Sequence, residues 1–129
     1  IILDEGVKKL LSVTDRVLLD IKYTDDKLYV ENVGCTMEKP IEFLEMCQEK
    51  GIPVTVRQVI IPTINDNEQS VQKLKGIVKK YPCVDKVELL PFRKICQTKY
   101  DSMNLVFPFA DKDTPAKETM DKLNKLLKI

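Results

Sequence analysis

The stretch Pro53-Val-Thr-Val-Arg-Gln-Val-Ile-Ile61 decides the fold, because it is dominated by β-branched residues and bounded by Gly51 and Pro62. Such a run with breakers on both sides predicts a largely buried strand. Two similar apolar runs flank it in the sequence, at Arg16–Lys22 and at Val84–Leu90. The chain therefore contains about three strands of one kind.

Helical patterns separate these strands. Apolar residues recur at helical spacing in residues 3–11, 41–47, 71–81 and 120–127. The order is helix, strand, helix, strand, helix, strand, a long loop over residues 91–115, and a last helix. Alternation of this kind predicts an α/β fold of parallel β/α repeats, with about three strands in a single partial domain over residues 1–129. Asn65 followed by Glu68 predicts the start of the third helix.

The composition excludes several classes of site. The 129 residues contain no histidine, which rules out Ser-His-Asp and Cys-His catalysis and histidine-containing zinc sites within this chain. The net charge of +1 does not call for nucleic acid or an anionic membrane. Cysteines 35, 47, 83 and 96 have no metal-ligand spacing. We therefore expect a cytoplasmic protein with reduced thiols, no metal site, no nucleic-acid partner and no membrane span.

Candidate site residues stand where the strands end, because ligands bind at the carboxyl ends of parallel strands. Asp20 and Lys22 are two residues apart and so share one face of the first strand. They could hold a ribose and a carboxylate, or simply form an ion pair. Arg57 stands within the second strand and faces a polar cavity, a neighbouring acid such as Asp20, or solvent at a sheet edge. Leu90 and Arg93 flank the end of the third strand, which offers either a ring-binding surface or an ordinary exit into a loop.

Several segments, in this order, carry a resemblance to a known family. They are Val13-Thr-Asp-Arg-Val-Leu-Leu-Asp-Ile-Lys22, the second strand with Pro62 and Asn65-Asp66, Val87-Glu-Leu-Leu-Pro-Phe92, Lys99-Tyr100, and Thr114-Pro-Ala-Lys-Glu-Thr-Met120. As an ordered set they resemble the C-terminal half of glycyl-radical-enzyme activating enzymes, which belong to the radical S-adenosylmethionine superfamily. The resemblance implies the second half of a partial (β/α)6 TIM-like barrel and a longer parent enzyme.

The resemblance also implies cofactors and partners. The cofactors are S-adenosylmethionine and a 4Fe–4S cluster held by C-x-x-x-C-x-x-C, a motif that this sequence lacks. The implied partners are a glycyl-radical enzyme of the pyruvate formate-lyase kind and an electron donor such as flavodoxin or ferredoxin. This half would help to bind S-adenosylmethionine and the target peptide, and we expect the isolated 129-residue chain to be inactive.

Position by position, the resemblance assigns cofactor binding to a set of strand-end residues: Asp20, Lys22, Arg57, Val59, Leu90 and Arg93. Tyr29 and Arg93 stand where the family commonly carries histidine, and Thr36 and Met37 also depart from its pattern. Two alternatives to an activase stay open, a non-catalytic α/β module and a radical S-adenosylmethionine enzyme with a different substrate. We further expect the first strand to lie at an exposed sheet edge and to promote self-association.

Overall fold

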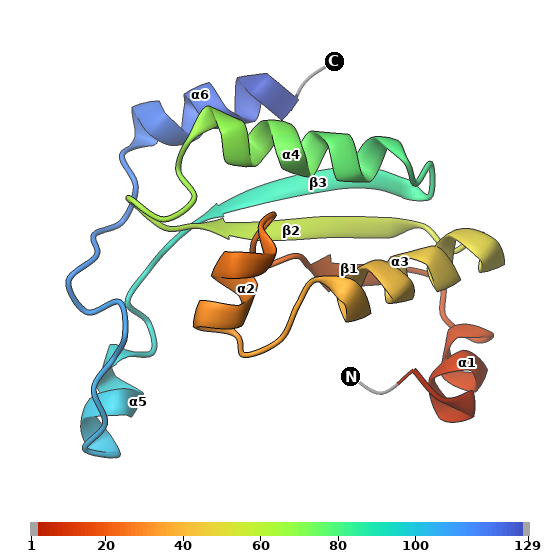
Figure 1. Cartoon of the computed structure of the whole chain (residues 1–129), viewed down its shortest axis with the longest axis horizontal. Coiled ribbons are helices and arrows are strands. Elements are labelled where there is room, and N and C mark those ends of the chain that lie inside the picture. Colours follow the sequence, from red (N-terminus) through yellow and green to blue (C-terminus); the bar gives the residue numbers. More distant parts are fainter. Residues whose placement is uncertain (1–2, 128–129) are drawn as a thin grey trace.

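The computed structural model describes residues 3–127 and shows one sheet of three parallel strands alternating with helices (Figure 1). The strand order is β1-β2-β3, so the predicted α/β fold and the edge position of the first strand are confirmed. The elements are α1 (Glu5–Leu11), β1 (Val17–Asp20), α2 (Asp26–Asn32), α3 (Glu38–Lys50), β2 (Val54–Ile60), α4 (Glu68–Lys79), β3 (Val84–Pro91), α5 (Gln97–Ser102) and α6 (Lys117–Leu127).

One face of the sheet carries the main core. Val54, Val56 and Ile60 of β2 point to this face and are fully buried. They belong to one apolar cluster with residues of α3, α4 and α6, including Leu44, Val71, Leu74 and Leu123. Figure 1 shows α4 and α6 lying side by side along the sheet. The helices therefore cover this face, as the apolar stripes in the sequence predict.

The opposite face, called here the open face, carries the alternate residues of each strand. Asp20 lies beside Arg57, Arg57 beside Glu88, and Val59 beside Leu90 in the register of the sheet. Leu18 on this face is 58% exposed although it lies in a strand. A depression of about 550 Å³ follows the face between β1 and β3. Its lining consists of Arg16, Leu18, Thr55, Arg57, Asp85, Lys86 and Glu88.

The predicted loop over residues 91–115 contains structure of its own. It forms the short helix α5 and a second apolar cluster, in which Ile61, Phe92 and Phe107 are buried. The rings of Phe92 and Phe107 stack with centroids 6.1 Å apart. Because Val59 packs against this cluster, the loop extends the open face at the carboxyl ends of the strands.

The predicted role of Asn65 is wrong. Helix α4 is capped by Asn67, whose carboxamide oxygen accepts a hydrogen bond of 2.8 Å from the Ser70 N–H. Asn65 is fully buried, accepts a hydrogen bond from the Ile61 N–H at 2.7 Å and donates one to the Val59 carbonyl at 2.9 Å. It therefore closes the turn that follows β2, a task that no local pattern distinguishes from helix capping.

Among residues 3–127, no helix is both long and apolar enough to span a membrane.

Candidate functional site

An alternating row of charges crosses the open face at the level where β1 ends. The Asp20 carboxylate accepts a hydrogen bond from Arg57 Nε at 2.8 Å and lies 3.3 Å from Lys22 Nζ. On the other side of Arg57, Glu88 pairs with Lys86 at 2.8 Å. The ion pair between Asp20 and Arg57 that the sequence offered as one alternative is present. It occupies only one carboxylate oxygen, and both side chains remain about a third exposed or more.

The electrostatics of this row keep its acids ionised. Partial burial raises the pKa of Asp20, but the hydrogen bond from Arg57 and the charge of Lys22 outweigh it and hold this pKa below its usual range. The hydrogen bond and charge of Lys86, with a smaller contribution from Arg57, likewise lower the pKa of Glu88. A ligand at this edge therefore meets fixed charges of both signs.

An apolar pair adjoins the charges. Val59 and Leu90 lie side by side in the register of β2 and β3, and both are half-buried. They stand one step closer to the carboxyl ends than Arg57 and Glu88. Charge and apolar surface thus meet on one face, which suits a ligand that has both a charged end and a flat ring.

Five of the six predicted site residues share this face, and Arg93 stands apart from them. Arg93 follows the end of β3 at Pro91 and is exposed. Within the part of the chain that the structure describes, it makes no hydrogen bond or ion pair with the other five. The predicted contact between Arg93 and a flat ring would therefore form only when a ligand is bound.

Two buried side chains hold the end of β1 in place. The Tyr29 hydroxyl accepts a hydrogen bond of 2.8 Å from the Lys22 N–H, and Gln58 Nε2 donates one of 3.2 Å to the Ile21 carbonyl. Gln58 is 1% exposed, and its carboxamide oxygen has no partner among the residues described. Sequence reasoning missed this layer. The available signal was the position of Tyr29, which stands where the resembled family commonly carries histidine.

The cysteines of this chain do not fit an iron–sulfur cluster. All four are free thiols: Cys35 is exposed, Cys47 is buried, and Cys83 and Cys96 are intermediate. Burial raises the pKa of the Cys47 thiol to about 11, which disfavours the thiolate that a cluster requires. No three His, Cys, Asp or Glu residues between positions 3 and 127 lie close enough together to hold a metal ion. We therefore assign no cluster ligand to the residues described.

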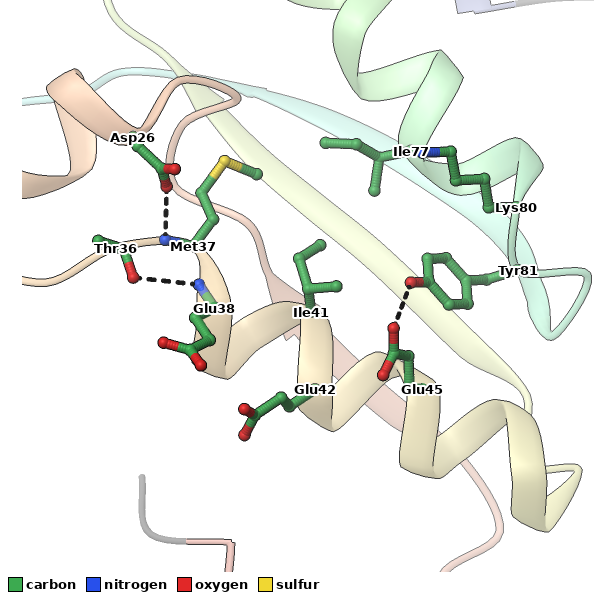
Figure 2. A pocket seen from close by; sticks show the side chains of 10 residues that line it. All are labelled: Asp26, Thr36, Met37, Glu38, Ile41, Glu42, Glu45, Ile77, Lys80 and Tyr81. Carbon is green, nitrogen blue, oxygen red and sulfur yellow. Dashed lines mark hydrogen bonds between the residues drawn. The ribbon is translucent and has the colours of Figure 1, made fainter.

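A separate groove of about 580 Å³ lies between α3 and α4 (Figure 2). Met37, Ile41 and Ile77 form its apolar part, and the Tyr81 hydroxyl donates a hydrogen bond of 3.1 Å to Glu45 across it. None of the six predicted site residues lines this groove. Thr36 and Met37, which depart from the family pattern, lie at its end near the start of α3. The departure of Thr36 and Met37 from the family pattern therefore concerns the start of α3, which lies on the covered side of the sheet.

Comparisons with known proteins agree with the fold and the resemblance. The chain is 38% identical over 121 residues to the pyruvate formate-lyase-activating enzyme of Clostridium pasteurianum, covering 94% of this chain and 51% of that protein. It is 30% identical over 124 residues to the pyruvate formate-lyase 1-activating enzyme of Escherichia coli K12, covering 96% of this chain and 50% of that protein. The chain thus spans about half the length of these curated relatives. No family model matches it.

Solved structures give the same answer for the fold. A domain of a pyruvate-formate lyase-activating enzyme from Bacteroides vulgatus superimposes with a TM-score of 0.75 at 17% identity, covering 96% of this chain and 68% of that one. A radical SAM methyltransferase from Sphaerobacter thermophilus gives a TM-score of 0.70 at 17% identity, covering 95% and 34%. The three-stranded sheet therefore resembles part of the fold of these two proteins, and the chain is homologous to pyruvate formate-lyase-activating enzymes over about half of their length.

Proposed function

We propose that this chain is the C-terminal half of a radical S-adenosylmethionine activase and that its open face helps to bind S-adenosylmethionine. The observation that carries the proposal is the charged row Lys22–Asp20–Arg57, which lies beside Val59 and Leu90 at the carboxyl ends of an uncovered sheet face. The identity to activating enzymes over about half of their length supports the reaction class. The target is then a glycyl-radical enzyme of the pyruvate formate-lyase kind.

Each residue of the row has a donor or acceptor that fits one part of the cofactor. The Asp20 Oδ2 atom, which accepts a hydrogen bond of 3.3 Å from Lys22, has a second lone pair for a ribose hydroxyl, and the Lys22 ammonium can face the methionyl carboxylate. Val59 and Leu90 offer apolar contact to the adenine, and the exposed Arg93 guanidinium can stack on its other side. Arg57 orients Asp20 and stands next to the target peptide.

The bound cofactor supplies the hydrogen-abstracting chemistry, and this half supplies charge and position. The cysteines of residues 3–127 do not gather, and in this proposal the cluster is held by another part of the parent enzyme. We therefore expect the isolated chain to be inactive. Cleavage of S-adenosylmethionine by this chain after reconstitution with iron and sulfide would contradict that expectation.

A ligand titration tests the proposed site. ¹H–¹⁵N NMR spectra of the chain with increasing S-adenosylmethionine should show shifts at Asp20–Lys22, Val59 and Leu90. Lys22→Ala should weaken binding, whereas Lys27→Ala, which removes another exposed lysine from α2, should not. Absence of shifts at millimolar cofactor, or shifts confined to the groove between α3 and α4, would overturn the proposal.

A specific observation also favours one alternative function. The 2.8 Å bond between Arg57 and Asp20 joins β1 to β2, which is what a purely structural ion pair would do. In a non-catalytic α/β module, Asp20→Ala would lower the stability of the chain and leave its cofactor affinity unchanged. The same titration, combined with urea unfolding of this variant, separates the two functions.

A further inference from the structure

Lys22 lies at the point where the backbone ladder of β1 ends. The last bond to the neighbouring strand on this side is donated by the Ile21 N–H to the Arg57 carbonyl at 3.0 Å. The next N–H, that of Lys22, points to the free edge of β1, away from β2, and donates to the Tyr29 hydroxyl at 2.8 Å. One side chain therefore supplies, on the unpaired side of the strand, the bond that fixes the backbone of Lys22.

Tyr29 is itself held firmly. It is 2% exposed, and its ring packs edge-on against Tyr23 with centroids 5.8 Å apart. Helix α2, which carries it, is fixed at its start because the Asp25 carboxylate accepts hydrogen bonds from the Lys27 and Leu28 N–H groups. A buried phenol on a capped helix is a fixed acceptor, so the Lys22 backbone has a defined position.

The Lys22 side chain, by contrast, has little to hold it. Half of its surface is exposed, and its ammonium contacts Asp20 at 3.3 Å. A long exposed side chain samples many rotamers, so the point at which it leaves the backbone largely decides where its ammonium can reach. The Tyr29 hydroxyl sets that point.

We infer that Tyr29 is a positioning residue of the cofactor site: its hydroxyl fixes the Lys22 backbone so that the Lys22 ammonium stands beside Asp20 and faces the ligand. The inference rests on the proposed function, because it adds a residue to the same site. Tyr29 is buried, and it acts through the backbone of Lys22.

Hydrogen exchange tests the anchor without any cofactor. The Lys22 amide should be protected in the unmodified chain, and Tyr29→Phe, which keeps the ring and removes the hydroxyl, should raise its exchange rate at least tenfold. The Ile21 amide, which is bonded to Arg57, should keep its protection. Tyr23→Phe is the matched control, since Tyr23 is equally buried and makes no bond to Lys22. Equal exchange of the Lys22 amide in the chain and in Tyr29→Phe would overturn the inference.

Titration with S-adenosylmethionine tests the consequence for binding. Loss of one hydrogen bond predicts about fivefold weaker binding by Tyr29→Phe and a change below twofold for Tyr23→Phe. In the Lys22→Ala background, Tyr29→Phe should have no further effect, because the group through which it acts is gone. An equal loss in both backgrounds would indicate a merely structural role and overturn the inference.

The outcomes separate this inference from the proposed function. If Lys22→Ala weakens binding and Tyr29→Phe does not, the positioning role is wrong and the proposed site stands. If Lys22→Ala leaves the affinity unchanged, both are wrong.

Discussion

Replacing Asn65 by alanine should destabilise the fold more than any exposed polar substitution. The side chain is fully buried and satisfies two backbone groups, the Ile61 N–H at 2.7 Å and the Val59 carbonyl at 2.9 Å. A buried group left without a partner costs about 1–3 kcal/mol, so Asn65→Ala should lower the free energy of unfolding by about 2–6 kcal/mol. That is a large share of the roughly 5–15 kcal/mol by which a domain is stable.

Urea unfolding followed by circular dichroism measures this loss. With an m-value of about 2 kcal/mol/M, the midpoint should fall by about 1–3 M while m stays unchanged. Asn32→Ala is the matched control, since Asn32 is exposed and its amide donates to the Leu28 carbonyl one turn away, and its effect should stay within about 0.5 kcal/mol. Asn65→Asp keeps the acceptor for Ile61 but loses the donor to Val59, so it should also destabilise. A loss below about 1 kcal/mol in Asn65→Ala would refute the reasoning.

Three further predictions concern the turn, the charged row and the sheet edge. Thr63 has a φ of 66°, a left-handed conformation that strains a β-branched residue but not glycine. In urea unfolding, Thr63→Gly should therefore be about 1–2 kcal/mol more stable than Thr63→Val. Equal stability of the two variants would contradict backbone strain at this position. The lowered pKa of Asp20 means that its ionised form contributes stability above about pH 4, and that this contribution is lost as pH falls through the lowered folded-state pKa. The stability difference between the chain and Asp20→Asn should therefore be constant at pH 6–7 and shrink towards pH 2, and a difference unchanged at pH 2 would count against the ion pair. Strand β1 lies at the edge of the sheet and its Leu18 is 58% exposed, so we expect chains to associate through this edge. The mass measured by light scattering should rise with concentration, and Leu18→Lys should reduce the rise. A monomer at millimolar concentration would argue against edge pairing.

The strands could be predicted because their signals are local. Breaker residues bound each apolar run, and alternation along β2 separates a covered face from an open one without knowledge of the neighbours. The segments that escaped prediction depend on distant contacts. Helix α2 has seven residues and only one that is buried, Tyr29, so it shows no apolar stripe. Helix α5 has none that is buried, and its segment packs through the rings of Tyr100 and Phe107.

The residues of the site likewise divide into those that local sequence signals could predict and those that they could not. Asp20, Lys22 and Arg57 could be placed on one face from strand periodicity, and the register of β1 with β2 brings them together. The tasks of Tyr29 and Asn65 could not be predicted, because each bonds a backbone group whose partner is decided only by where a strand stops. Two asparagines two residues apart are chemically equal until the fold buries one and leaves Asn67 to cap α4.

The two faces of β2 have a consequence for the effect of substitutions along this strand. Val56 and Ile60 pack into the main core, whereas Arg57 and Val59 lie on the open face. Substitutions at Arg57 and Val59 therefore change the surface that the open face presents, at the cost of the Asp20 ion pair or of the contacts with the second apolar cluster, whereas substitutions at Val56 and Ile60 act on the main core alone.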